Sequence, residues 1–228
     1  MTGVQTCALP ISGQEGTYAE KVAVKAAVVA KKPDGLSHVD AAALALIGLT
    51  AINSVDDTLK LKKGETILIQ GGAGGVASFA IQFAKSVGAK VISTTSTGNV
   101  DYVKSLGADQ VIDYKTDDFT RLGQTVDCVF ETVGGETAAK SYSVLKPGGR
   151  AAFIASGPKA PPTDRTDVQG LRPPVPHGRA QMERIADLAV KGAVKPPEVK
   201  LFKLSDAAEA QKISEGRHFR GKLVFKIR

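Results

Sequence analysis

The 228-residue sequence has no tryptophan, only two cysteines and only three histidines. Cys7 and Cys128 are too few for a disulfide framework or for a cysteine-rich zinc lobe. The histidines His38, His177 and His218 are dispersed along the chain, and we interpret them as surface residues. The sequence therefore predicts no metal site.

Long apolar stretches are also missing. No uninterrupted apolar run reaches the ~18 residues that a membrane-spanning helix needs. The N-terminus lacks the cationic start and the small-residue cleavage site of a secretory signal. We therefore expect a cytoplasmic protein with no membrane partner. Residues 1–12 show neither a helix cap nor a hydrophobic period, and we set them apart as a leader that is non-native or disordered.

Charge is distributed unevenly along the chain. The formal net charge is +7, and the segment 191–228 holds ten basic and four acidic residues. A basic surface can attract a phosphorylated ligand or a nucleic acid. Here the basic residues are scattered among apolar ones, without a run and without stacking aromatic residues, which disfavours nucleic acid as a partner. We favour a solvated surface.

Strand-like and helix-like segments alternate through the middle of the chain. The predicted strands are short and apolar, and the helices between them have the length of crossover connections. The strands are expected at 66–70, 90–94, 110–112, 127–131 and 151–155, and the helices at 76–87, 100–106 and 137–145. This alternation predicts an α/β fold with a doubly wound parallel sheet of the Rossmann type.

The flanking segments follow other patterns. Residues 16–29 alternate like a strand, and Ser37 and Asp40 have the spacing of a capping box. Residues 157–177 are rich in proline and without periodicity, which predicts a loop or a lid. We expect the remaining elements as helices at 41–47, 51–59 and 180–190, a strand at 199–204, a helix at 206–214 capped by Ser205, and a strand at 222–227.

The most specific motif follows the first predicted strand of the alternating region. The run Gly72-Ala73-Gly74-Gly75-Val76-Ala77 has the G-x-G-x-x-A spacing of dinucleotide-binding turns. Gly72 allows the tight turn, Gly74 lets the backbone approach a pyrophosphate, and Ala77 lets the helix pack on the sheet. Amide groups at the start of that helix can hold the phosphates. No lysine follows the glycines, which excludes an ATP-binding P-loop.

The end of the second strand of this region indicates which dinucleotide is bound. An NAD site places Asp or Glu about 20 residues after the first glycine, on the ribose 2′-hydroxyl. The run 94–99, Thr-Thr-Ser-Thr-Gly-Asn, contains no carboxylate. Its hydroxyl and amide groups can donate to a 2′-phosphate. The sequence therefore favours NADP(H) over NAD(H) as the cofactor.

Four runs together resemble the medium-chain dehydrogenase/reductase superfamily, and within it the zinc-independent, quinone-oxidoreductase-like branch. They are Gly-Leu-Thr-Ala at 48–51, Leu-Ile-Gln-Gly-Gly-Ala-Gly-Gly-Val at 68–76, Ser-Leu-Gly-Ala-Asp-Gln-Val-Ile-Asp-Tyr at 105–114 and Gly-Lys-Leu-Val at 221–224. The similarity extends from about Gly16 to the C-terminus. The resemblance implies an enzyme that transfers hydride from NADPH to a small-molecule quinone or to the activated double bond of an enone.

The resemblance also implies which residues contact the cofactor. It assigns Gly72, Gly74, Gly75 and Val76 to the pyrophosphate, Thr95, Ser96, Asn99 and Tyr114 to the adenosine phosphates, Thr50, Val133, Ile154 and Ser156 to the nicotinamide side, and Arg217 and Lys222 to charge neutralisation.

One departure from the family is large. Its members begin with a β-rich, GroES-like catalytic lobe that supplies the substrate wall, and this lobe is almost absent ahead of Gly16. We interpret the sequence as an N-terminally truncated member, with a remnant of the lobe at 13–50, the NADP(H)-binding domain at 51–192 and a returning segment at 193–228. We assign no catalytic residue. Relatives often form homodimers, whereas the prolines of 157–177 disfavour strand pairing there.

Other functional classes are also compatible with parts of the sequence. A non-catalytic dinucleotide-binding or RNA-binding relative would share the glycine motif. A zinc-type alcohol dehydrogenase would need a thiolate or imidazole ligand near residues 48–50, where the sequence has none. Tyr142 and Lys146 have the Y-x-x-x-K spacing of short-chain dehydrogenases, but they lie only about 70 residues past the glycine motif, too soon for that family.

Overall fold

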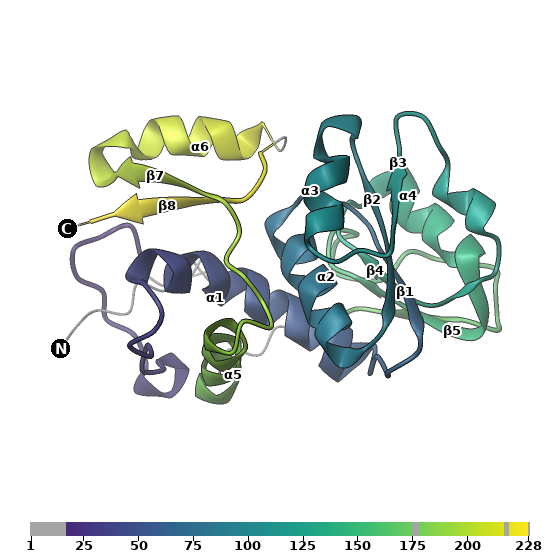
Figure 1. Ribbon diagram of the computed structural model, residues 1–228, viewed down its shortest axis with the longest axis horizontal. Coiled ribbons are helices and arrows are strands. Elements are labelled where there is room, and N and C mark those ends of the chain that lie inside the picture. The colour runs from purple at the N-terminus through teal and green to yellow at the C-terminus, as the bar shows by residue number, and fades with distance from the viewer. Residues whose placement is uncertain (1–16, 175–177, 217–218, 228) are drawn as a thin grey trace. The chain divides into compact units, whose positions relative to one another are not determined.

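The computed structural model describes residues 17–174, 178–216 and 219–227 (Figure 1). The chain divides into two compact units. Unit 1 comprises Met1–Leu49 together with Pro176–Arg228, and unit 2 comprises Thr50–Val175. Unit 2 thus ends before helix α5 (Arg179–Val190), which the sequence-based boundary at residue 192 had included.

Unit 2 is built on a six-stranded parallel sheet in the order β3-β2-β1-β4-β5-β6. The strands are β1 (Thr66–Ile69), β2 (Lys90–Thr95), β3 (Gln110–Asp113), β4 (Val126–Glu131), β5 (Leu145–Phe153) and β6 (Gln169–Leu171). The chain order reverses between β1 and β4, which is the switch point of a doubly wound Rossmann sheet. The predicted fold class is confirmed.

Helices cover both faces of this sheet. On one side lie α2 (Gly75–Val87) and α3 (Val100–Ser105), and on the other lie α4 (Gly135–Lys140) and the 3-10 helix η5 (Ser141–Val144) (Figure 1). Two further 3-10 helices are η3 (Thr97–Asn99) and η4 (Phe119–Leu122). Helix α2 ends at Gly88, whose φ of 89° is the left-handed conformation that glycine supplies at a helix end.

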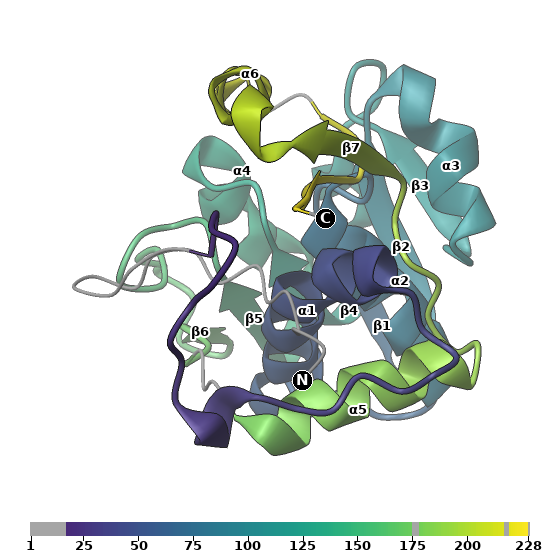
Figure 2. The same cartoon turned by 90° about the vertical axis from the view of Figure 1, so that its left-hand side faces the viewer.

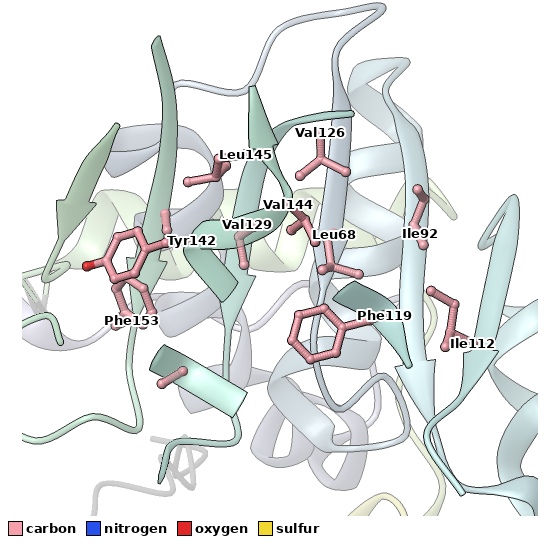
Figure 3. Packing of buried hydrophobic residues seen from close by; sticks show 12 residues of the cluster. Leu68, Ile92, Ile112, Phe119, Val126, Val129, Tyr142, Val144, Leu145 and Phe153 are labelled. Carbon is pink, nitrogen blue, oxygen red and sulfur yellow. The ribbon is translucent and has the colours of Figure 1, made fainter. Parts of the chain in front are cut away.

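The core on the α4 side of the sheet is apolar and closely packed (Figure 3). Leu68, Ile92 and Val129 occupy matching register positions on β1, β2 and β4, and all three are buried. The ring of Tyr142 in η5 packs against the ring of Phe153 in β5, with 5.1 Å between the ring centroids. Burial of these side chains fixes the strands whose carboxyl ends form the candidate site.

Unit 1 contains helices and a two-stranded parallel sheet. Its elements are η1 (Ala26–Val28), α1 (His38–Ile52, which continues into unit 2), α5, β7 (Val199–Lys203), η6 (Leu204–Asp206), α6 (Ala207–Glu215) and β8 (Lys222–Lys226). The segment ahead of α1 runs beside α5 (Figure 2). Arg179 of α5 donates to the carbonyl groups of Val29 and Ala26, each at 2.9 Å.

Helix α1 begins as the sequence predicts. The N–H of Asp40 donates to Ser37 Oγ at 3.0 Å, which is the capping contact expected from their spacing. The helices predicted at 41–47 and 51–59 form one stretch, because α1 continues directly into the π-helix η2 (Asn53–Thr58). The combined stretch His38–Thr58 is long and apolar enough to cross a membrane, but 67% of its most apolar window is buried inside the protein, as in a core helix.

Three local predictions are wrong. The described residues 17–29 form no strand, because no neighbouring strand pairs with them there, and Tyr18 instead packs edge-on against Phe225 at 4.5 Å. The proline-rich stretch contains β6, which pairs with β5 at the sheet edge. Ser205 does not cap α6, because Asp206 is the N-cap residue.

Candidate functional site

The glycine motif forms the turn between β1 and α2, as predicted. The residue with the left-handed backbone is Gly71, just before the motif, whose φ is 72°. A Cβ on Gly72 would collide with Ser93 Oγ on β2 and lie 3.0 Å from Val103 Cγ1 on α3. The sequence interpretation gave the turning role to Gly72. In the structure Gly71 makes the turn, and Gly72 allows β2 and α3 to pack closely.

The first two amides of this turn are bound within the protein. The N–H of Gly71 donates to Thr94 Oγ1 at 3.1 Å, and the N–H of Gly72 donates to the Thr94 carbonyl at 2.8 Å. These two groups anchor the turn to β2. They are therefore already engaged, and the donors for a ligand must come from the start of α2.

The start of α2 is not capped by a side chain. Its N-cap residue is Gly74, which is exposed and has no side chain to offer. Gly75 and Val76 open the helix, and N–H groups in a first helical turn have no partner within the helix. An uncapped helix start combines free donors with the positive end of the helix dipole, an arrangement that binds phosphate groups.

The residues predicted for the adenosine phosphates lie together at the ends of β2 and β3. Thr95 closes β2, and Ser96 and Asn99 form the turn after it, joined by a bond of 3.0 Å from Asn99 Nδ2 to Ser96 Oγ. The N–H of Tyr114, just after β3, donates to the Thr95 carbonyl at 3.0 Å. Tyr114 is 52% exposed, and Lys115 Nζ lies 5.5 Å from the centroid of its ring.

The sequence interpretation missed one carboxylate in this place. Asp113 closes β3 and is in register with Thr95. A hydrogen bond from the Thr97 side chain lowers the pKa of Asp113, and the N–H of Lys115 adds to this effect. Asp113 is therefore ionised at neutral pH. The dinucleotide pattern concerns the end of the second strand, whereas parallel pairing also brings the end of the third strand to this edge.

The residues predicted for the nicotinamide side follow β4 and β5. Val133 is 54% exposed, and its N–H donates to Glu131 Oε1 at 2.7 Å. The N–H of Ile154 donates to the Glu131 carbonyl at 3.1 Å. Ser156 Oγ donates to the Lys159 carbonyl at 2.8 Å. All three predicted residues lie past the carboxyl ends of their strands, at the sheet edge that also carries the glycine turn.

Glu131, at the end of β4, is a second acid that the sequence interpretation missed. Its side chain is fully buried, and its Oε1 also accepts from the N–H of Gly134 at 2.8 Å. Its Oε2 is buried without a hydrogen-bond partner among the described residues. Burial raises the pKa of this carboxyl, and the N–H groups of Gly134 and Val133 offset only part of the rise. An acid at the end of an apolar strand belongs to no motif that could have signalled it.

The other three predicted residues belong to α1, to unit 1 or to the part of the chain that the structure does not describe. Thr50 is half-buried in α1, and its carbonyl accepts from Ser54 Oγ at 2.7 Å. Lys222 belongs to unit 1, where its N–H donates to the Glu198 carbonyl at 2.8 Å. Arg217 lies outside the described residues. The cofactor roles of these residues stay predictions.

Two competing chemistries can be compared with the structure. Tyr142 and Lys146 do not act as a pair, because Tyr142 donates to the Pro161 carbonyl and Lys146 binds Asp127, each at 2.8 Å. Within the described ranges no three His, Cys, Asp or Glu side chains gather into a group that could hold a metal. Burial raises the pKa of Cys128 to about 12, so its thiol is unreactive.

Known proteins match this chain in sequence and in structure. A family model described as zinc-binding dehydrogenase matches residues 106–225, just over half of the chain. The 2-haloacrylate reductase of a Burkholderia species is 31% identical over 97% of this chain and 72% of its own length. The chain belongs to the medium-chain dehydrogenase/reductase superfamily. Its place is in the quinone oxidoreductase and enone reductase branch, as the motifs indicated.

Other members of the superfamily extend this comparison. The 2-methylene-furan-3-one reductase of Solanum lycopersicum is 39% identical over 186 residues, which is 80% of this chain and 45% of the reductase. The solved structure of Escherichia coli quinone oxidoreductase complexed with NADPH matches with a TM-score of 0.75 and 27% identity, over 86% of this chain and 67% of that one. The chain thus spans about half the length of the tomato reductase.

Proposed function

We propose that this protein is an NADPH-dependent oxidoreductase that transfers a hydride to a quinone or to an activated double bond, without zinc. The observation that carries the proposal is the uncapped start of α2 behind the Gly71–Gly74 turn, at the switch point of the sheet. Free amide donors and a helix dipole at this position suit a dinucleotide diphosphate. The residues present therefore fit the cofactor.

The end of β2 supports NADPH over NADH. Ser96 and Asn99 place a hydroxyl and an amide in one turn, and both groups can donate to a phosphate. Asp113 adds negative charge at this edge, but Lys115 follows it and partly offsets that charge. We infer that the turn from Ser96 to Asn99 receives the 2′-phosphate.

The nicotinamide side supports a reductase that acts on conjugated acceptors. Val133 and Ile154 present apolar surface past β4 and β5, and apolar surface beside a nicotinamide excludes water. The bound cofactor would supply the hydride, while the protein binds and orients it. The names of the tomato and Burkholderia relatives both describe substrates with a carbon–carbon double bond next to a carbonyl or carboxyl carbon.

Two measurements test the proposal. NADPH fluorescence is followed as the 228-residue chain is titrated, and NADPH oxidation is then followed with a panel of quinones and enones. We expect tighter binding of NADPH than of NADH, and oxidation with at least one acceptor. Failure to bind millimolar NADPH, or a preference for NADH, would overturn the cofactor assignment. Binding without oxidation across the panel would favour a non-catalytic dinucleotide binder.

A matched pair of variants tests whether the start of α2 is the binding element. In Gly74→Asp the new carboxylate caps the helix and repels phosphate, so the variant should be at least as stable as the parent chain and lose NADPH binding. Gly74→Ala adds the same Cβ, 3.3 Å from the Gly71 carbonyl, without the charge. Equal NADPH affinity in Gly74→Asp and Gly74→Ala would contradict the assignment.

A further inference from the structure

The carboxyl ends of β1 and β2 carry a buried network of hydrogen-bonded polar side chains. Ser141 Oγ donates to the Thr137 carbonyl at 2.8 Å, and Gln70 Nε2 donates to Ser141 Oγ at 3.4 Å. Thr94 Oγ1 donates to Gln70 Oε1 at 2.6 Å. The N–H of Gly71 donates to Thr94 Oγ1 at 3.1 Å. Four hydrogen bonds thus connect α4 and η5 to the first residue of the glycine turn.

Because these side chains are buried, the loss of any one hydrogen bond in the network would be costly. Gln70, Thr94 and Ser141 are 1%, 3% and 0% exposed, on the face of the sheet that otherwise carries the apolar cluster around Leu68 and Ile92. A buried amide or hydroxyl without a partner costs about 1–3 kcal/mol. An apolar side chain at position 70 would avoid this risk if packing were the only requirement.

Each group in the network donates to the next one, and this order of donors and acceptors fixes the geometry of the turn. A hydroxyl has a single proton, and Thr94 gives its proton to Gln70 Oε1. The Thr94 oxygen is then left to accept from the N–H of Gly71, the residue with φ of 72°. The network therefore holds the left-handed residue in one orientation relative to β2, and with it the direction in which α2 begins.

Gln70 also contacts the turn that follows β4. Thr132 Oγ1 donates to the Gln70 carbonyl at 2.8 Å, and the N–H of Gln70 donates to the Phe130 carbonyl at 3.0 Å. Thr132 directly precedes Val133, on the nicotinamide side. One residue thus joins the turn assigned to the diphosphate with the turn assigned to the nicotinamide.

We propose that Gln70 and Thr94 are positioning residues, which set the glycine turn so that the amides of α2 are aligned on a diphosphate. The inference rests on the proposed function, since it concerns how the same cofactor is held. Neither side chain needs to touch the cofactor, because each acts through Gly71.

The test uses variants that change the hydroxyl but little else. Thr94→Val keeps the branched shape and removes the hydroxyl, and Thr94→Ser keeps the hydroxyl. Ser93→Ala is the matched control: Ser93 is buried on the same strand, but its hydroxyl donates to the Ile69 carbonyl at 2.7 Å and makes no hydrogen bond to the turn. Should Thr94→Val fail to fold, Gln70→Met removes the next link with a side chain of similar length.

Two ligands distinguish a positioning role from a general loss of folded structure. NADPH contains the diphosphate, whereas adenosine 2′-phosphate lacks it. We expect Thr94→Val to raise the dissociation constant for NADPH about tenfold and to leave that for adenosine 2′-phosphate within about twofold. Gln70→Met should raise the dissociation constant for NADPH about threefold and also leave that for adenosine 2′-phosphate within about twofold. Thr94→Ser and Ser93→Ala should stay within about twofold of the parent chain for both probes.

The outcomes are distinguishable from failure of the proposed function. A parent chain that ignores NADPH would refute the function itself. A parent chain that binds NADPH, with Thr94→Val binding it equally well, would refute the positioning role. Equal weakening of both probes would also refute it, because that result indicates loss of structure rather than loss of the diphosphate contact.

Discussion

Replacement of Glu131 by glutamine is expected to stabilise the protein at alkaline pH and to have little effect at acidic pH. The carboxyl is fully buried, its Oε1 accepts two backbone N–H groups, and its Oε2 has no partner among the described residues. A glutamine Oε1 can accept the same two N–H groups. Its NH₂ group takes the place of Oε2 without bringing a charge into the interior, where an ionised oxygen is costly.

The sign of the pH dependence follows from the raised pKa of Glu131. The folded protein holds this proton more tightly than the unfolded chain does, so the stabilising contribution is complete below the ordinary pKa of a carboxyl group. It is lost as the pH rises through the raised pKa of the folded state. Glutamine does not titrate, so Glu131→Gln removes this loss. We expect a gain of about 1 kcal/mol at pH 8, or about 2–4 °C in Tm.

Glu131→Ala gives the opposite result and serves as the control. It leaves the N–H groups of Val133 and Gly134 without their acceptor and opens a cavity, so the free energy of unfolding should fall by about 2–4 kcal/mol at every pH. Thermal unfolding of the three proteins between pH 5 and pH 8 measures these effects. If the Tm of Glu131→Gln and of the parent chain changed in parallel with pH, the buried carboxyl would not be the titrating group and the reasoning would be refuted.

Three further substitutions test packing and charge in unit 2. Gly72→Ala should lower the free energy of unfolding by about 1–3 kcal/mol in urea and abolish NADPH binding in fluorescence titration, whereas Gly98→Ala, with nothing within 4 Å of its new Cβ, should leave the free energy of unfolding unchanged. Asp113→Asn should tighten NADPH binding about twofold at low salt and leave NADH unchanged, and an effect that persists in high salt would contradict the electrostatic cause. Arg150→Ala breaks the 2.7 Å ion pair with Glu65 and should cost about 2 kcal/mol in urea unfolding, and an unchanged midpoint would show that the pair contributes nothing.

The order of strands and helices in unit 2 could be predicted from the sequence because its signals are local. The strand at 66–69 is a short apolar run, the strand at 90–95 is rich in β-branched residues, and α2 begins and ends at glycines. Periodicity and glycine conformation depend on neighbouring residues, so they can be recognised without the fold. The glycine motif was located for the same reason.

Strand β6 and the strand predicted at 17–29 show that local sequence patterns do not determine which segments form strands. Residues 169–171 carry no strand pattern, yet they pair with β5 because an open sheet edge was available to them. Residues 17–29 carry the pattern, yet in the described structure no neighbouring strand pairs with them. A strand forms only when a partner supplies the other half of its hydrogen bonds, and alternation cannot show whether that partner exists.

By itself the sequence determined the sheet architecture of unit 2, the place of the glycine turn and the membership of the superfamily. Tertiary structure alone decided that Gly71 makes the turn, that Thr94 holds its amide, and that Glu131 is buried with one oxygen unpartnered. The physical reason is distance along the chain. Thr94 lies 23 residues from Gly71, and Gln70 lies 71 residues from Ser141, so burial and hydrogen-bond partners are set only when the folded sheet brings these segments together.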